Sequence, residues 1–149
     1  MSKSQDNGDK GENEVIEKIK CPNCNRKLML LPKNYPLVDV QCTGWYFRAQ
    51  VKTQSNKPNK TQMGSGWDIM EKTIKAGYPI PPLIINFKWK DGQEIRFYPF
   101  IPRDNLKKRQ LSETAKRANY RMFIYRELDK LPYFVLYKKW IFKFYSVIL

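Results

Sequence analysis

Three polar side chains have types and a spacing that suit the hydrolysis of a phosphodiester: Asp39, Gln50 and Lys52. Carboxylate and amide oxygens are hard ligands for a divalent cation. An ammonium group beside such an ion can hold water or stabilise negative charge on a phosphate. On spacing alone, the alternative interpretation is that the three residues belong to a solvated strand face.

These residues lie in two strand-like runs, LVDVQC and WYFRAQVK, which flank Thr43-Gly44. That spacing predicts a hairpin with a two-residue turn, in which Asp39 lies opposite Arg48 and diagonal to Gln50. Alternation along the strands sorts the side chains onto two faces. The apolar face holds Val38, Val40, Phe47, Ala49 and Val51, and the polar face holds Asp39, Gln41, Tyr46, Arg48, Gln50 and Lys52.

The composition excludes several kinds of chemistry. The chain has no histidine, so it cannot carry a Ser-His-Asp or Cys-His nucleophile, an HExxH metalloprotease site or a histidine general base. It has 28 Lys+Arg against 14 Asp+Glu, a net charge of +14, while 42% hydrophobic residues are enough for a core. We therefore expect one folded basic domain over residues 11–149, after a disordered tail over residues 1–10.

The number of cysteines and the composition of the N-terminus favour one kind of cellular compartment. Three cysteines cannot all pair, and the N-terminus lacks the apolar run of a signal peptide. The apolar run near the C-terminus is too short to span a bilayer. We expect an intracellular, reducing environment such as the cytoplasm, and no association with a membrane.

The remaining elements follow from periodicity and turn signals. We expect a short helix from about Glu12, a mobile loop over residues 53–66, and a helix from about Trp67 to Ala76 capped by Ser65. The runs LIINFKW and EIRFYPF around Asp91-Gly92 predict a second hairpin. This order of helices and strands predicts an α/β or α+β fold.

The pattern Pro36-Leu37-Val38-Asp39, ten residues, Gln50-Val51-Lys52 resembles the motif of the PD-(D/E)xK nuclease superfamily. The ordered set CPNC, PLVDVQC, FRAQVK and LSETAKRANY is similar to the catalytic domain of the DpnI and Dam-replacing restriction endonucleases, from about Glu12 to about Leu136. The resemblance implies a restriction-endonuclease-like core, with a mixed central sheet flanked by helices and a cysteine-containing knuckle. It also implies a restriction-type endonuclease that uses Mg²⁺ to hydrolyse double-stranded DNA.

Carried over by position, the resemblance assigns roles to individual residues. Asp39 becomes the metal-binding carboxylate, Gln50 takes the second acidic position, Val51 offers its carbonyl to the metal, and Lys52 becomes the catalytic lysine. Glu12 falls where such folds place a carboxylate that orients water, with Glu14 as an alternative. The alternative is that Glu12 is only an acidic residue near the N-terminus of a helix, where the helix dipole stabilises negative charge.

Gln50 stands where the family's better-known member has Glu. An amide oxygen still binds a metal but carries no formal charge, so we expect weaker Mg²⁺ binding. The alternative function is therefore a catalytically weakened relative that only binds DNA.

The cysteines form an incomplete zinc motif, because Trp45 occupies the place of a fourth ligand after Cys21, Cys24 and Cys42. Two interpretations remain open: the cysteines bind a structural Zn²⁺, or Cys21 and Cys24 belong to a turn that no longer binds metal and packs against the hairpin. A zinc-ribbon protein with an RNA partner is a third, weaker hypothesis.

A basic segment follows residue 103 and is a candidate DNA contact. The alternative is a solvated charged face. Dimerisation on DNA is plausible for double-strand cleavage. The DpnI-like members carry a C-terminal winged-helix domain that reads methylated adenine, and this sequence leaves no room for it, so a preference for methylated GATC sites stays open. The candidate phosphate contacts are Lys107, Lys108, Arg109, Lys116 and Arg117.

Overall fold

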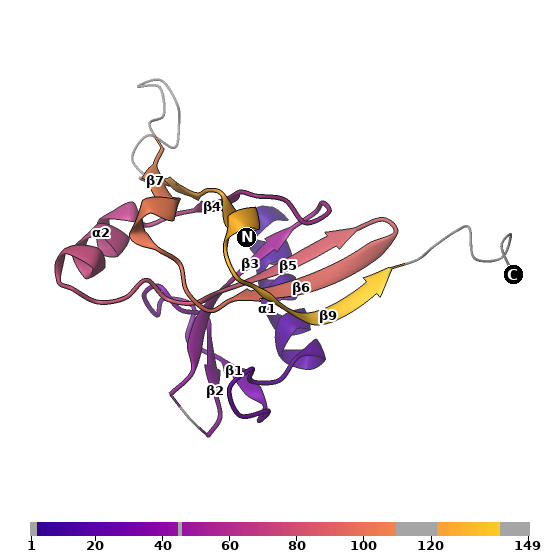
Figure 1. The fold of residues 1–149 in the computed structure, drawn as a ribbon. Helices are drawn as coiled ribbons and strands as arrows, with labels where there is room; N and C mark the ends of the chain where they lie inside the picture. The colour runs from indigo at the N-terminus through magenta and orange to yellow at the C-terminus, as the bar shows by residue number, and fades with distance from the viewer. Residues whose placement is uncertain (1–2, 45, 110–121, 141–149) are drawn as a thin grey trace, which may run out of the picture.

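A six-stranded mixed sheet forms the centre of the fold in the computed structural model, which describes residues 3–44, 46–109 and 122–140 (Figure 1). Only β3 and β5 run parallel, and every other neighbouring pair is antiparallel. The expected α+β fold with a mixed sheet is confirmed. In order across the sheet, the strands are β1 (Leu28–Leu30), β2 (Val40–Cys42), β3 (Arg48–Gln54), β5 (Leu83–Trp89), β6 (Gly92–Tyr98) and β9 (Phe134–Trp140).

A second, three-stranded sheet joins β4, β8 and β7 in that order. Because parallel strands need a crossover connection, the chain between β3 and β5 has room for β4 and for helix α2. Short 3₁₀ helices, η1 (Arg103–Asn105) and η3 (Leu128–Lys130), lie before β7 and after β8 in sequence. Its strands are β4 (Gln62–Gly64), β7 (Leu106–Lys108) and β8 (Phe123–Tyr125), and α2 covers Trp67–Lys75.

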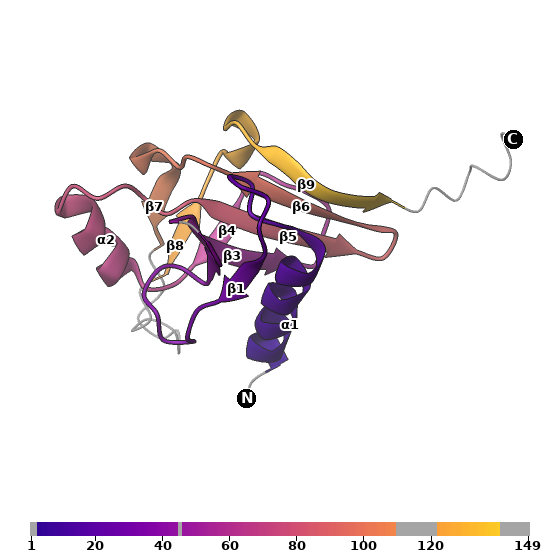
Figure 2. The same ribbon diagram turned by 90° about the horizontal axis from the view of Figure 1, so that it is seen from below.

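Two apolar cores lie on opposite faces of the large sheet. Helix α1 (Lys3–Lys18) packs against one face through Val15 and Ile19, which meet Val51 of β3 (Figure 2). The other core contains Met70 of α2 and residues of the small sheet. Successive side chains of a strand point to opposite faces, so β5 sends Ile84 to the first core and its neighbours to the second. This burial on both faces explains the continuous apolar run of β5.

Helix α1 begins at Lys3, so the structure differs from the expected disordered tail over residues 1–10. The segment looked unstructured because its residues are polar, but it forms the first turns of the helix and makes one ion pair with the chain before β2. The Lys33 Nζ atom lies 3.1 Å from Asp9 Oδ2, and the amide of Asn13 donates to the Asp9 carbonyl at 2.9 Å. Neither described helix is long and apolar enough to cross a membrane.

The expected loop over residues 53–66 is interrupted by strand residues at 53–54 and 62–64, while residues 55–61 and 65–66 lie outside helices and strands. Strand β3 continues to Gln54, and β4 pairs with β8. The side-chain amide of Gln54 donates to the Thr61 carbonyl at 2.7 Å and to Gln62 Oε1 at 2.6 Å, so polar side chains supply the hydrogen bonds that join β3 to β4.

The second helix was placed correctly but its cap was not. Gly66, not Ser65, is the N-cap residue, and its φ of 81° lies in the left-handed region that glycine adopts without steric cost. The predicted hairpin of β5 and β6 is confirmed. Trp89 lies opposite Gly92, which makes Lys90 and Asp91 the turn residues.

Candidate active site

The β2–β3 pairing brings Asp39 beside Gln50. The predicted register was wrong by two residues, because Gln41 rather than Asp39 lies opposite Arg48. The connection is longer than two residues and is closed by the Cys42 N–H, which donates to the Phe47 carbonyl at 2.9 Å. A shift of two residues leaves every side chain on its predicted face, so the two faces of the hairpin are as expected.

Asp39 forms hydrogen bonds with the backbone on both sides of Gln50. Its N–H donates to the Ala49 carbonyl at 2.9 Å, and its Oδ2 accepts the N–H of Val51 at 2.7 Å. A side-chain oxygen therefore stands where the next backbone hydrogen bond of the β2–β3 ladder would be. The opening beside this contact, lined by Asp39 and by Glu12 of α1, is the candidate site.

The chain before Asp39 turns sharply, which carries it away from β3. The Val38 N–H donates to the Pro36 carbonyl at 2.9 Å, and Leu37 between them has a φ of 65°. A hydrogen bond across one residue with positive φ at its centre is the rare, strained form of γ-turn. Such strain is characteristic of functional sites, where the surrounding structure holds it.

Helix α1 approaches this opening closely because residue 11 is glycine. A Cβ atom at Gly11 would lie 1.8 Å from Thr53 Oγ1 of β3, so no larger residue fits without a shift. Glycine within a helix costs about 1 kcal/mol relative to alanine, and here the close approach explains its presence. The next residue along the helix is Glu12, which reaches the opening where Asp39 lies.

Glu12, Asp39 and Lys52 share one electrostatic environment. Burial, followed by repulsion from Asp39 and Asp9, raises the pKa of Glu12 to about 7. Burial also raises the pKa of Asp39, against the opposing effects of the Val51 N–H and of Lys52. Burial lowers the pKa of Lys52, while Asp39 and Glu12 act to raise it. A cavity of about 310 Å³ opens here, lined by Asp9, Glu12, Leu31, Pro32, Lys33, Asn34 and Asp39.

Glu14 belongs to a different polar cluster. Its carboxylate accepts hydrogen bonds from Lys88 Nζ at 2.8 Å and Asn86 Nδ2 at 3.1 Å, and also from the amide of Gln93. Burial acts to raise the pKa of Glu14, but these hydrogen bonds outweigh it and lower the pKa overall. Of the two candidate acids, only Glu12 lines the cavity beside Asp39.

Tyr125 is a site residue that the sequence reasoning missed. It is fully buried in β8 of the small sheet, and its hydroxyl donates to Gln50 Oε1. Burial, followed by repulsion from Asp39, raises the pKa of this phenol, so its proton stays in place as a donor. Tyr125 lies 75 residues from Gln50 along the chain, and no local pattern could have paired them.

The three cysteines converge as predicted. The Sγ atoms of Cys21, Cys24 and Cys42 all lie within 4.8 Å of one another, with 3.4 Å between Cys24 and Cys42. Backbone N–H groups of Asn23 and Gly44 each point at a sulfur, at 3.4 Å. Such N–H groups favour thiolates, although burial raises the pKa of Cys21 overall. The three sulfurs are close enough together to bind one metal ion. Trp45, expected in the fourth position, lies outside the described residues.

The candidate DNA contacts fall partly within the described chain. Lys107 and Lys108 are exposed on β7, and the exposed Arg109 follows them, with its Nη1 3.7 Å from the sulfur of Met63. β7 pairs with β8, the strand that carries Tyr125. Lys116 and Arg117 lie outside the described residues.

Comparison with known proteins identifies the family of the chain. A protein-family model described as the DpnI Dam-replacing family matches residues 1–136 of the 149. No curated protein matches the chain.

Proposed function

We propose that this chain, which belongs to the DpnI Dam-replacing family, is a metal-dependent restriction-type endonuclease that hydrolyses phosphodiester bonds of double-stranded DNA. Membership of the family supports a restriction-type nuclease. One observation carries the rest of the proposal: Glu12 and Asp39 line one opening, Lys52 interacts electrostatically with both, and Asp39 accepts the N–H of Val51, the residue next to Gln50.

The oxygen atoms at this opening fit Mg²⁺, which prefers carboxylate, carbonyl and water oxygens. Asp39 and Gln50 would hold the ion through their side chains. Val51 would add its carbonyl, because the N–H and C=O of one strand residue point to the same side and the N–H already faces Asp39. When bound, the ion would neutralise charge on the phosphate and lower the pKa of a water molecule.

The remaining residues supply proton transfer and charge stabilisation. In the hydrolysis, an oxygen of water bonds to phosphorus and gives up a proton, one bridging P–O bond breaks, and the released sugar oxygen takes up a proton from solvent to become a hydroxyl. Glu12, with a pKa of about 7, suits the role of a base that accepts this proton near neutral pH. The Lys52 ammonium, beside Asp39 and Glu12, would stabilise the negative charge that builds on the phosphate oxygens.

The test is plasmid cleavage by the purified protein. We would incubate Dam-methylated and unmethylated plasmid with Mg²⁺ or with EDTA. Discrete Mg²⁺-dependent fragments are expected from wild type and from Asp129→Ala, which alters an exposed aspartate of η3. Asp39→Ala should give none. Fragments from the methylated plasmid alone would extend the proposal to methyl-directed cleavage, and equal cleavage by Asp39→Ala would refute the assigned site.

A second candidate function is DNA binding without cleavage. Gln50 favours it, because its amide carries no charge and its Oε1 already accepts a hydrogen bond from the Tyr125 hydroxyl. Intact plasmid that still shifts on a gel would support this alternative. Cleavage gained by Gln50→Glu would then identify residue 50 as the cause of the lost activity.

We also propose that the cysteine cluster holds a structural Zn²⁺. Zinc takes four ligands, so three thiolates would require one further ligand, for example water. The proposal is supported by the convergence of the sulfurs and by the N–H groups that point at them. A zinc content near one per chain is the expected result.

A further inference from the structure

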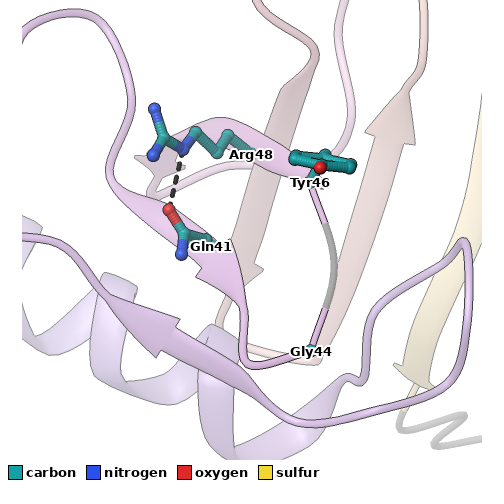
Figure 3. Close-up of a pocket in the computed structure, with 4 residues that line it drawn as sticks. All are labelled: Gln41, Gly44, Tyr46 and Arg48. Atoms are coloured by element: carbon teal, nitrogen blue, oxygen red, sulfur yellow. Dashed lines mark hydrogen bonds between the residues drawn. The ribbon is translucent and has the colours of Figure 1, made fainter.

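A hollow lies on the polar face of the β2–β3 hairpin, beside the candidate active site. Its volume is about 590 Å³, and Gln41, Gly44, Tyr46 and Arg48 line it. Figure 3 shows the Arg48 side chain extending away from the Tyr46 ring toward Gln41, to which it donates a hydrogen bond. We propose that this hollow binds the sugar-phosphate backbone of the DNA strand next to the cleaved bond, with Arg48 as the ligand of a phosphate.

Arg48 is held in place by neutral partners. Its Nε donates to Gln41 Oε1 at 2.7 Å, and its Nη1 donates to the hydroxyl of Tyr35 at 2.7 Å. The guanidinium also stacks on the Tyr35 ring, 5.2 Å from the ring centroid. A planar guanidinium that is already oriented loses less freedom when it binds a phosphate in bidentate fashion.

The charge of Arg48 is not neutralised within the described part of the chain. None of the ion pairs found there includes Arg48, and no acidic side chain lines the hollow. A second cation stands at the rim, since Arg26 Nη1 donates to the Gly44 carbonyl at 3.4 Å. An oriented arginine without an acidic partner, in an open concave surface, favours an anionic ligand.

The position of the hollow favours DNA over a free anion. Arg48, Gln50 and Lys52 alternate along β3 and point to the same face. At about 3.3 Å per residue, the backbone of Arg48 lies about 7 Å from that of Gln50. That distance corresponds to the rise of about two nucleotides along one strand, so a strand in the active site would carry a nearby phosphate to Arg48. The inference therefore rests on the proposed function.

Tyr46 adds an aromatic surface to the same hollow. Its side chain is 86% exposed, and it lines the hollow together with Arg48. An exposed ring beside a phosphate ligand can pack on a sugar, a contact that positions a strand without reading its sequence. Arg48 and Tyr46 would then align the strand without selecting the base.

The test is the salt dependence of DNA binding, measured by fluorescence anisotropy with a short fluorescein-labelled duplex in EDTA. Each phosphate contact contributes about 0.9 to the slope of log K against log salt. Arg48→Ala should therefore lower the slope by about one between about 50 and 200 mM salt. Tyr46→Ala should weaken binding several-fold without changing the slope, because it removes no charge.

The matched control is Lys90→Ala, which removes one positive charge from the exposed turn between β5 and β6 and should leave the slope unchanged. Arg48→Lys should leave the salt-dependence slope unchanged, because it retains the positive charge. It should bind DNA more weakly, because lysine lacks the paired N–H donors of the guanidinium. Thermal melting of each variant verifies folding. Equal slopes for wild type, Arg48→Ala and Lys90→Ala would overturn the inference. Because EDTA prevents metal-dependent cleavage, a failure of the nuclease proposal in the plasmid assay remains distinguishable from this result.

Discussion

Replacing Glu12 by glutamine should stabilise the protein at alkaline pH while it removes nuclease activity. The Glu12 carboxylate lies half-buried beside Asp39, and this environment disfavours its charged form. Glutamine keeps the shape of the side chain but carries no charge to repel Asp39. The same substitution removes the group proposed to accept a proton from water. Opposite effects on stability and activity are expected where a protein maintains an unfavourable charge for function.

The size of the effect follows from the shift in pKa. Folding raises the pKa of Glu12 from 4.5 to about 7, and each unit corresponds to about 1.4 kcal/mol. The upper limit is therefore about 3 kcal/mol, and because solvent screens a half-exposed group, we expect about 1–2 kcal/mol. Below pH 4.5 the carboxyl is protonated in both the folded and the unfolded state and costs nothing. Between pH 4.5 and about 7 the unfolded state has released the proton while the folded state still holds it, so the wild type becomes progressively less stable than Glu12→Gln, and above about pH 7 the difference is constant.

Thermal unfolding in EDTA tests this reasoning. Near pH 8.5, at which Glu12 is ionised in both states, Glu12→Gln should melt roughly 3–8 °C above wild type, and near pH 4.5 the two melting temperatures should converge. Glu17→Gln, an exposed change on the same helix, should show no such pH dependence. A wild type that is equally or more stable than Glu12→Gln near pH 8.5 would refute the assignment of Glu12 to a shared, partly buried site with Asp39.

Further predictions concern the residues that support the site. Tyr125→Phe removes the hydroxyl that orients Gln50 Oε1. We expect it to raise the Mg²⁺ concentration needed for half-maximal cleavage several-fold, as measured by metal titration, whereas an unchanged metal requirement would mean that the contact has no role in metal binding. Gly11→Ala places a Cβ 1.8 Å from Thr53 Oγ1, so it should destabilise the fold by about 1–3 kcal/mol in urea denaturation. Adding Thr53→Ala should recover part of that loss, and a double variant no better than Gly11→Ala would argue against the contact. Cys24→Ser should reduce the zinc content well below one per chain by atomic absorption, while Ser55→Ala, an exposed control, should not; a wild type without zinc would refute the structural metal site.

The composition of the site on β2 and β3 could be predicted from the sequence because strand geometry is periodic. Alternating side chains point to opposite faces, and the register error of two residues changed the partner of Asp39 but not its face. The convergence of Cys21, Cys24 and Cys42 was predictable for a similar reason, since two of them share a tight turn and the third lies on the adjoining hairpin. Short-range patterns carry this kind of information well.

Other features depend on contacts between segments far apart in the chain. Residues 3–10 look unstructured by composition, yet they belong to helix α1. In that helix Asp9 contacts the segment before β2, and Gly11 lies against β3. The chain reaches Asp39 through the turn at Leu37, a conformation that leucine rarely adopts by itself.

The sequence by itself determined which residue types are available for chemistry, that histidine is not among them, and which side chains of residues 38–52 share a face. Only the tertiary structure decided that Glu12 rather than Glu14 lies beside Asp39, that Tyr125 binds Gln50, and that Arg48 is oriented without an acidic partner in the described chain. The physical reason is that alternation is a local property of the backbone. How deeply a carboxylate is buried, and which group hydrogen-bonds to an amide, depend on how separate elements pack. That packing minimises the free energy of the whole chain rather than of any one segment.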